Sequence, residues 1–256
     1  MPEPTPFVHV PIACLDNFLP MLLQHQLPPE LALKGPDLDA WDALPWAALA
    51  EIAAAGLPVA LHAPFLDLSP ASPDPQVRQI TLLRHQQALR LAERLGAVVC
   101  VVHPGYDRWR FAPGGSLWHE RSCDFWQPLA QQAENCGCRL ALENIFETEP
   151  HALAALIHAM DSPAFGHCFD MGHFHLFAQV PLASWFASLG PAMIHLHLHD
   201  NHGQDDEHLP LGEGTIDVPA VFHHVKQRTS RPTLTLEHHS AERLLRGLKQ
   251  FRRFMA

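Results

Sequence analysis

Two patterns of apolar residues alternate along the chain. Runs of about four to eight apolar or alternating residues predict strands, and longer segments with apolar residues three or four positions apart predict helices. In one such helix Ile80, Leu83, Leu91 and Leu95 recur at helical spacing before Gly96. The predicted strands are 7–13, 30–34, 58–62, 97–103, 139–143, 165–170, 193–199 and 233–237, and the predicted helices lie near 16–26, 44–55, 74–95, 119–137, 150–160, 181–189, 218–228 and 241–255.

Eight strands, each followed by a helix, are typical of a (β/α)₈ TIM barrel. No Gly/Ser linker or break in composition interrupts the alternation, so one domain is expected over residues 1–256. A hydrophobic content of 47% with 17% charged residues agrees with a folded chain that has a sizeable core. The fold class predicted from the pattern is therefore α/β, a single TIM barrel.

From the third strand onwards, every predicted strand ends in a side chain that can bind a metal. Because successive strand side chains alternate faces, these residues share the inner face with small or apolar neighbours such as Ala60 and Val101. The active sites of such barrels lie at the carboxyl ends of the strands. The residues concerned are His62, His103, Glu143, Asp170 with His173 just beyond it, His197 and Glu237.

The densest run of such residues is 193–214, MIHLHLHDNHGQDDEHLPLGEG. His195, His197 and His199 alternate with aliphatic residues and must share one face of the strand. His197 is predicted at the site, His195 deeper in the core, and His199 as a partner of a ligand. Asp206 and His208 follow in an acidic loop, in which Asp205 or Glu207 could serve in place of Asp206. So many carboxylates and imidazoles together predict a bound cation.

The composition narrows the classes of partner. Lys and Arg number 17 against 27 Asp and Glu, a formal net charge of -10, which argues against a nucleic-acid surface. No signal peptide or membrane span is expected, and the six cysteines are scattered, which predicts reduced residues in a cytoplasmic protein. The sequence does not indicate an oligomeric state.

Several motifs at the strand ends resemble the endonuclease four family, part of the wider xylose isomerase-like superfamily of sugar phosphate isomerases and epimerases. Each motif alone is short, but their order along the chain, one at each strand end, is specific. They are HAPF (62–65), HPG (103–105), LEN (142–144), FDMGH (169–173), HLHD (197–200), DEH before LGEG (206–214) and LE (236–237).

The resemblance to endonuclease four implies a site for up to three zinc ions. Imidazole and carboxylate ligands suit zinc, with manganese, iron or cobalt as other possible metals. By that resemblance His62, His103 and Glu143 bind the first ion; Glu143 as a bridge, Asp170, His197 and Glu237 bind the second; and His173, Asp206 and His208 bind the third. The function expected on this basis is a hydrolase that cleaves a small-molecule phosphodiester or a sugar-phosphate substrate.

The wider superfamily implies a second function. Its isomerases and epimerases hold one divalent metal with the residues that match Glu143, Asp170, His197 and Glu237, and the two glutamates form the acid/base pair. His173 matches their substrate-contacting histidine. Residues 199–208 lack the Lys or Arg that many of these enzymes carry there, which favours the hydrolase. A barrel without catalysis, serving as a binding module, is the third and weakest hypothesis.

Four residues outside the metal-ligand set are predicted to contact substrate. Arg108 and Arg110 lie in a long loop after the fourth strand, beside Trp109. Phe65 follows the third strand, and Lys34 ends the second, where it could meet a substrate phosphate.

Overall fold

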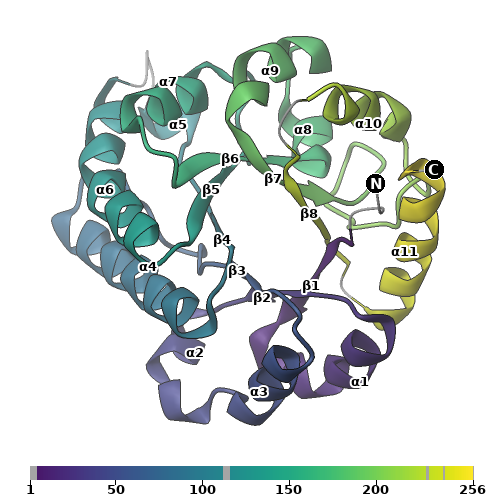
Figure 1. Cartoon of the computed structure of the whole chain (residues 1–256). Helices are drawn as coiled ribbons and strands as arrows, with labels where there is room; N and C mark the ends of the chain where they lie inside the picture. The colour runs from purple at the N-terminus through teal and green to yellow at the C-terminus, as the bar shows by residue number, and fades with distance from the viewer. Residues whose placement is uncertain (1–4, 112–115, 229–230, 239, 256) are drawn as a thin grey trace.

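Eight parallel strands close into a barrel in sequence order, β1 to β8, with the helices around the outside (Figure 1). The computed structural model describes residues 5–111, 116–228, 231–238 and 240–255. The strands are β1 Phe7–Pro11, β2 Pro29–Ala32, β3 Ala60–His62, β4 Val99–Val102, β5 Arg139–Glu143, β6 Phe165–Asp170, β7 Met193–Leu198 and β8 Thr233–Leu236. The predicted α/β TIM barrel is confirmed.

The helices follow the predicted order. They are α1 Leu15–His25, α2 Gly35–Asp39, α3 Trp46–Ala54, α4 Pro75–Leu95, α5 Arg108–Phe111, α6 Ser116–Asn135, α7 His151–Met160, α8 Met171–Phe177, α9 Leu182–Leu189, α10 Val218–Lys226 and α11 Ala241–Met255. The 3₁₀ turns η1 Ile12–Cys14, η2 Trp41–Ala43 and η3 Gly190–Ala192 join some of them. The long helix predicted over 74–95 is α4, which Asp74 caps through the backbone N–H of Gln76 at 2.8 Å.

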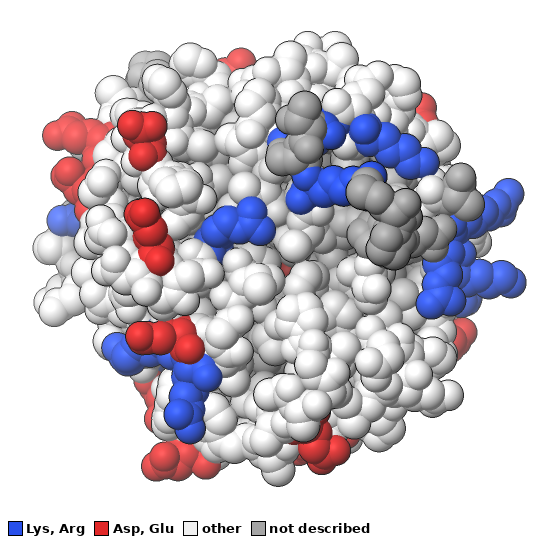
Figure 2. Space-filling model, viewed as in Figure 1, with Lys and Arg blue, Asp and Glu red and all other residues white. Residues whose placement is uncertain are grey.

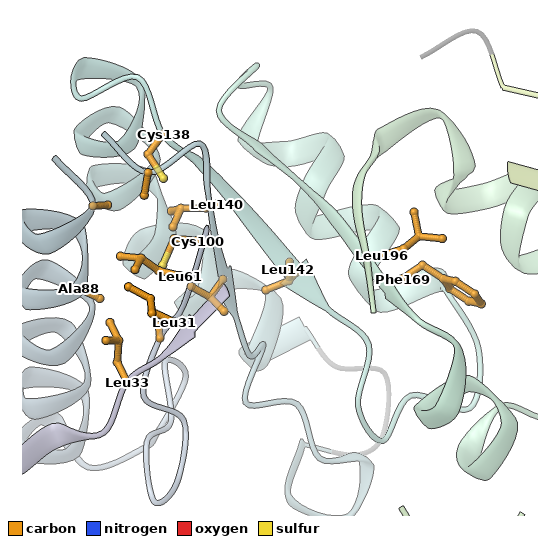
Figure 3. Packing of buried hydrophobic residues seen from close by; sticks show 14 of the residues in the cluster. Leu31, Leu33, Leu61, Ala88, Cys100, Cys138, Leu140, Leu142, Phe169 and Leu196 are labelled. Atoms are coloured by element: carbon orange, nitrogen blue, oxygen red, sulfur yellow. The ribbon is translucent and has the colours of Figure 1, made fainter. Parts of the chain in front are cut away.

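The two faces of each strand are filled as the alternation of residues predicts. Outward residues such as Leu61 and Leu142 are buried against the helix layer, where α4 contributes Ala88 (Figure 3). A second, smaller cluster fills the barrel interior with Phe7, Ala60, Val99, Val101, Ala141 and Cys168. Ala60, Val101, Ala141 and Cys168 each lie two residues before a polar residue on the same strand or just after it. The polar residues therefore lie closer than this cluster to the carboxyl end of the barrel.

Three short helices, α2, α5 and α8, were not predicted, and α8 bears on the site. Helix α8 begins directly after β6, and the carboxylate of Asp170 accepts the backbone N–H of His173 at 2.7 Å. A helix N-terminus that starts at the strand end leaves no loop between the two residues. This capping contact places His173 beside Asp170 at the carboxyl end of the barrel.

Charge is unevenly spread over the face in Figure 2. Basic residues gather mainly at the upper right, where α10 and α11 lie in Figure 1, and acidic residues mainly along the left and lower margins. None of the six cysteines takes part in a disulfide. Among the described residues, no helix is both long and apolar enough to cross a membrane.

Candidate metal centre

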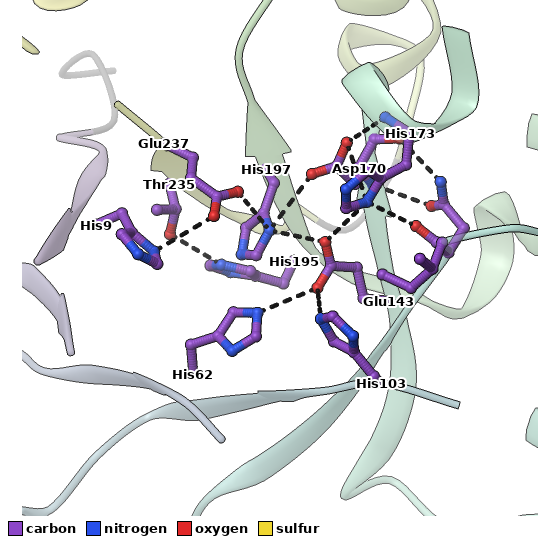
Figure 4. A network of polar contacts seen from close by, with 12 residues as sticks. His9, His62, His103, Glu143, Asp170, His173, His195, His197, Thr235 and Glu237 are labelled. Atoms are coloured by element: carbon purple, nitrogen blue, oxygen red, sulfur yellow. Dashed lines mark hydrogen bonds and ion pairs between the residues drawn. The ribbon is translucent and has the colours of Figure 1, made fainter. Parts of the chain in front are cut away.

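Glu143, the last residue of β5, is the hub of the polar cluster in Figure 4. Its Oε2 lies 3.3 Å from His62 Nε2 and 3.2 Å from His103 Nε2. Its Oε1 lies 3.2 Å from the Nδ1 atoms of both His173 and His197. A single buried carboxylate therefore faces imidazoles from four different barrel strands or the segments that follow them. This arrangement suits the bridging role expected of Glu143.

Four predicted ligands form the largest candidate group among the described residues. Glu143, Asp170, His197 and Glu237 each offer a ligand atom, and these atoms lie within 4.8 Å of one another. All four residues are buried. Three carboxylates at this separation repel one another strongly in a buried place, and a divalent cation would compensate that repulsion. The donor set, with oxygen atoms in the majority, suits Mn²⁺, Mg²⁺ or Co²⁺ as well as Zn²⁺.

The neighbouring imidazoles keep these carboxylates ionised. Burial by itself raises the pKa of Glu143, but the charges of His197 and His103 outweigh it and hold the pKa well below its usual range. For Glu237 burial again acts upward, while His197 and His9 lower its pKa strongly. Asp170 follows the same pattern: burial acts upward, and His173 and His199 bring its pKa below the ordinary value. The carboxylates are therefore ionised at neutral pH, as ligands of a cation must be.

A second candidate group adjoins the first. His199, His208 and Glu237 also offer atoms within 4.8 Å of one another. The His199 and His208 rings stack at 4.1 Å, and His199 Nε2 lies 3.0 Å from Asp170 Oδ2. The latter contact agrees with the expected role of His199 as a partner of a ligand.

The residues expected to hold a third ion also approach one another. Asp206 Oδ2 lies 3.3 Å from His173 Nε2 and 3.6 Å from His208 Nδ1. Glu207, considered as a substitute for Asp206, instead accepts the backbone N–H of His202 at 2.8 Å. The structure therefore brings the nine predicted ligands into one continuous cluster, while the assignment of each residue to a particular ion stays a prediction.

Strands β1 and β2 add two residues to the cluster that the sequence did not single out as functional. Glu30, on β2, is buried, with Oε2 2.8 Å from His195 Nε2 and Oε1 3.1 Å from His197 Nε2. His9, on β1, places Nδ1 3.5 Å from Glu237 Oε1. One signal could have found Glu30, because its parity within β2 places a carboxylate inside the barrel, where an unpaired charge is costly.

The predicted substrate contacts are placed at the rim. Phe65 stacks on His103 at 4.2 Å, so it borders the cluster. Lys34 is exposed at the start of α2, and its backbone N–H donates to Asp37. Arg108 and Arg110 are exposed on α5, where Arg108 lies over the ring of Trp109 at 4.9 Å. Within the described part of the chain, no hydrogen bond or ion pair joins Lys34, Arg108 or Arg110 to the cluster.

The chain is a closed TIM barrel with imidazoles and carboxylates clustered at the carboxyl end of its strands. The chain belongs to the xylose isomerase-like TIM barrel family, whose model matches residues 28–254. The predicted superfamily is therefore confirmed.

Two curated relatives match part of the chain, one without and one with an assigned activity. An uncharacterised protein of Methanocaldococcus jannaschii is 32% identical over 176 residues, which cover 66% of this chain and 60% of that protein. Fructoselysine 3-epimerase of Escherichia coli is 26% identical over 173 residues, which cover 64% of this chain and 61% of the enzyme. The match spans less than two thirds of the length of each of these two relatives.

Two solved structures resemble the chain along most of its length. A D-tagatose 3-epimerase-like protein is 25% identical with a TM-score of 0.76, and the match covers 89% of this chain and 88% of that one. A Thermus thermophilus protein soaked with zinc chloride is 28% identical with a TM-score of 0.81, and the match covers 98% of this chain and 97% of that one.

The comparisons overturn the predicted hydrolase. The similar proteins include fructoselysine 3-epimerase and the D-tagatose 3-epimerase-like protein. Phosphodiester hydrolysis and the small-molecule phosphodiester or sugar-phosphate substrate expected with it were therefore wrong. The error has a physical cause: the extra imidazoles match the ligands of a multi-zinc site, but ligand identity alone does not specify the reaction that a metal assists.

Proposed function

We propose that this protein is a divalent-metal-dependent epimerase or isomerase of a ketose or a ketose derivative. The observation that carries the proposal is the buried group of Glu143, Asp170, His197 and Glu237, whose ligand atoms lie within 4.8 Å of one another. The likeness to fructoselysine 3-epimerase supports this choice of reaction class. We assign one divalent ion to this group.

Glu143 and Glu237 form the proposed acid/base pair. They reach the same point from β5 and from the residue after β8, and both are ionised because the imidazoles lower their pKa values. One carboxylate removes the proton from the carbon next to the substrate carbonyl, the other takes a proton from solvent and donates it to the opposite face of that carbon, and the first carboxylate then releases its proton to solvent. When bound, a divalent ion supplies Lewis-acid polarisation of the substrate oxygens. The proton count balances over the cycle.

The remaining cluster residues orient the pair and the substrate. His62 and His103 both face Glu143 Oε2, whereas His197 faces Oε1. His173 Nδ1 lies 3.1 Å from the carbonyl oxygen of Asn144, so its ring is held while its Nε2 faces Asp206. We propose that His173 contacts the substrate, and that Phe65 forms an apolar edge of the binding site.

The metal at this group is proposed to be Mn²⁺, Co²⁺ or Mg²⁺, because three of its four donors are carboxylates. Zinc and further ions at His62, His103, His173, Asp206 and His208 stay a prediction. Elemental analysis of the purified protein tests the number: one equivalent per chain supports the single-ion assignment, and about three equivalents would replace it with the multi-ion arrangement.

Hydrogen exchange at carbon tests the reaction. The protein reconstituted with Mn²⁺ is incubated in D₂O with a panel of ketopentoses, ketohexoses and fructoselysine, and NMR follows the loss of the proton next to the carbonyl. Deuterium should enter at that carbon as the epimer appears. A metal-loaded protein that exchanges no proton in any member of the panel would overturn the proposal.

Two isosteric variants test the acid/base pair. Glu143→Gln and Glu237→Gln should each lower turnover by about 10²- to 10⁴-fold, because an amide cannot accept the proton. Glu242→Gln is the matched control, since Glu242 is exposed on α11. Turnover in either site variant equal to that of the control contradicts the assigned pair.

A further inference from the structure

A buried carboxylate lies beneath the proposed metal group, on a strand that contributes no proposed ligand. Glu30 is in β2, where it pairs with His9 of β1 and Ala60 of β3, and its side chain is completely buried. A buried carboxylate is costly unless other groups compensate its charge. Its position and its partners therefore require an explanation.

One oxygen of Glu30 is firmly held. Thr235 donates its hydroxyl proton to Glu30 Oε2 at 2.7 Å, and His195 Nε2 lies 2.8 Å from the same oxygen. His195 is fixed in turn, because its Nδ1 lies 2.6 Å from Thr233 Oγ1. Residues of β7 and β8 thus fix Glu30 through Oε2 and leave Oε1 available for another partner.

The second oxygen faces two imidazoles. Glu30 Oε1 lies 3.1 Å from His197 Nε2 and 3.7 Å from His9 Nδ1. These are ion-pair distances, and among the described residues neither Oε1 nor His197 Nε2 has a contact that meets hydrogen-bond geometry. The other ring nitrogen of His197, Nδ1, faces the proposed metal ligands, at 3.1 Å from Glu237, 3.2 Å from Glu143 and 3.6 Å from Asp170. The imidazole therefore stands between one carboxylate below and three above.

We propose that Glu30 is a positioning residue: its Oε1 accepts the Nε2 proton of His197 and so directs the Nδ1 lone pair toward the space between Glu143, Asp170 and Glu237. A carboxylate behind a metal-binding histidine fixes both the tautomer and the ring orientation, and it increases the basicity of the ligating nitrogen. The inference rests on the proposed function, because it takes His197 as a ligand of the divalent ion. It explains why a charged residue is retained in the barrel interior.

Manganese affinity measures this role without requiring turnover. The whole chain is stripped of metal and titrated with Mn²⁺, and EPR reports the free ion. Glu30→Gln should bind Mn²⁺ about 10- to 100-fold more weakly than the parent, as expected when the partner of a ligating histidine is altered. A difference of less than about threefold would overturn the positioning role, since it would fall below that range.

A double-mutant cycle separates positioning from simple charge. If Glu30 acts through His197, Glu30→Gln should change the affinity by less than about threefold in a His197→Gln background. If the charge of Glu30 attracts the cation directly, the same loss should persist in both backgrounds, which would refute the proposal. Glu30→Asp provides a variant that keeps the charge but withdraws the carboxylate from His197. It should also weaken binding, and parental affinity in that variant would count against the proposal even if Glu30→Gln did not fold.

Asp200→Asn is the matched control for buried charge. Asp200 is completely buried and accepts backbone N–H groups from Asn201, Gly212 and Ile216 at 2.9, 2.9 and 3.1 Å. This variant should lose thermal stability but keep the Mn²⁺ affinity of the parent. Equal weakening in Asp200→Asn and Glu30→Gln would assign the effect to folding and overturn the inference. A parent protein that binds no Mn²⁺ would refute the proposed function itself, whereas a parent that binds and a Glu30→Gln variant that binds equally would refute the positioning role alone.

Discussion

Adding a single methyl group at Gly172 should disturb the candidate metal centre. It lies in the first turn of α8, two residues after Asp170, and it is buried. A Cβ at this position would stand 2.0 Å from Cε1 and 2.6 Å from Nδ1 of the His199 ring. The prediction is that Gly172→Ala forces His199 away from its present place.

The size of the effect follows from these distances. Carbon atoms pack at about 3.5 Å or more, so the ring must retreat by roughly 1.5 Å. His199 is completely buried, with its Nε2 3.0 Å from Asp170 Oδ2 and its ring stacked on His208 at 4.1 Å. Overpacking of this kind costs about 1–3 kcal/mol, and each kcal/mol lowers the melting temperature by roughly 2–4 °C in a chain of this size. Loss of the contact with Asp170 should also weaken metal binding by about 10-fold or more.

Thermal unfolding and the Mn²⁺ titration measure the two effects separately. Gly35→Ala is the control, because a Cβ there would meet the flexible end of Arg84, at 3.0 Å from its Nε. The control should keep both the melting temperature and the affinity close to those of the parent. If Gly172→Ala melted within 1 °C of the control, as less than about 0.5 kcal/mol would imply, and bound Mn²⁺ equally well, the close packing of Gly172 against His199 would be refuted.

Three further predictions concern stability. Mn²⁺ at 100 times its Kd should stabilise the fold by about 2.7 kcal/mol, and a chelator should reverse the rise in melting temperature; no shift would contradict a site formed on folding. Burial lowers the pKa of His85 to about 4, so the unfolded chain binds more protons and the contribution of His85 to stability should fall by about 3 kcal/mol as the pH drops from about 6.5 to about 4. Burial raises the pKa of Glu147 to about 7, so the folded chain binds more protons and the contribution of Glu147 to stability should fall by about 3 kcal/mol as the pH rises from about 4.5 to about 7. Because the two contributions oppose each other, a denaturation series over this pH range compares each variant with the parent: relative to the parent, the stability of His85→Leu should decrease as the pH rises, and that of Glu147→Gln should increase. A pH dependence equal to that of the parent would exclude the substituted residue as a source.

The periodicity of apolar residues predicted most of the fold, because successive side chains of a strand point to opposite faces. Leu61 and Leu142 pack outward while His62 and Glu143 turn inward, and the alternation along the chain is enough to assign these sides. Helix α8 was missed because it depends on one capping contact between Asp170 and His173, which periodicity does not reveal.

The residue types of the predicted ligands did not decide between hydrolysis and epimerisation. His62 and His103 suggested a multi-zinc hydrolase. In the structure both rings face Glu143 Oε2, and this arrangement also suits two histidines that orient a catalytic carboxylate. Similarity to sugar epimerases decided against hydrolysis. Residue type limits which metals and proton transfers are possible, but it leaves the substrate open.

By itself, the sequence determined the barrel and the strand-end positions of Asp170, His197 and Glu237, because alternation fixes the face of a strand on which each side chain lies. Only the tertiary structure decided the partners of those side chains across the barrel. Glu30 is far from His197 in the chain, yet closure of eight strands brings its Oε1 to within 3.1 Å of the histidine Nε2. Periodicity predicts the face toward which a side chain points, but not its depth in the barrel or its distance from side chains on other strands. The packing of all eight strands sets that depth and those distances.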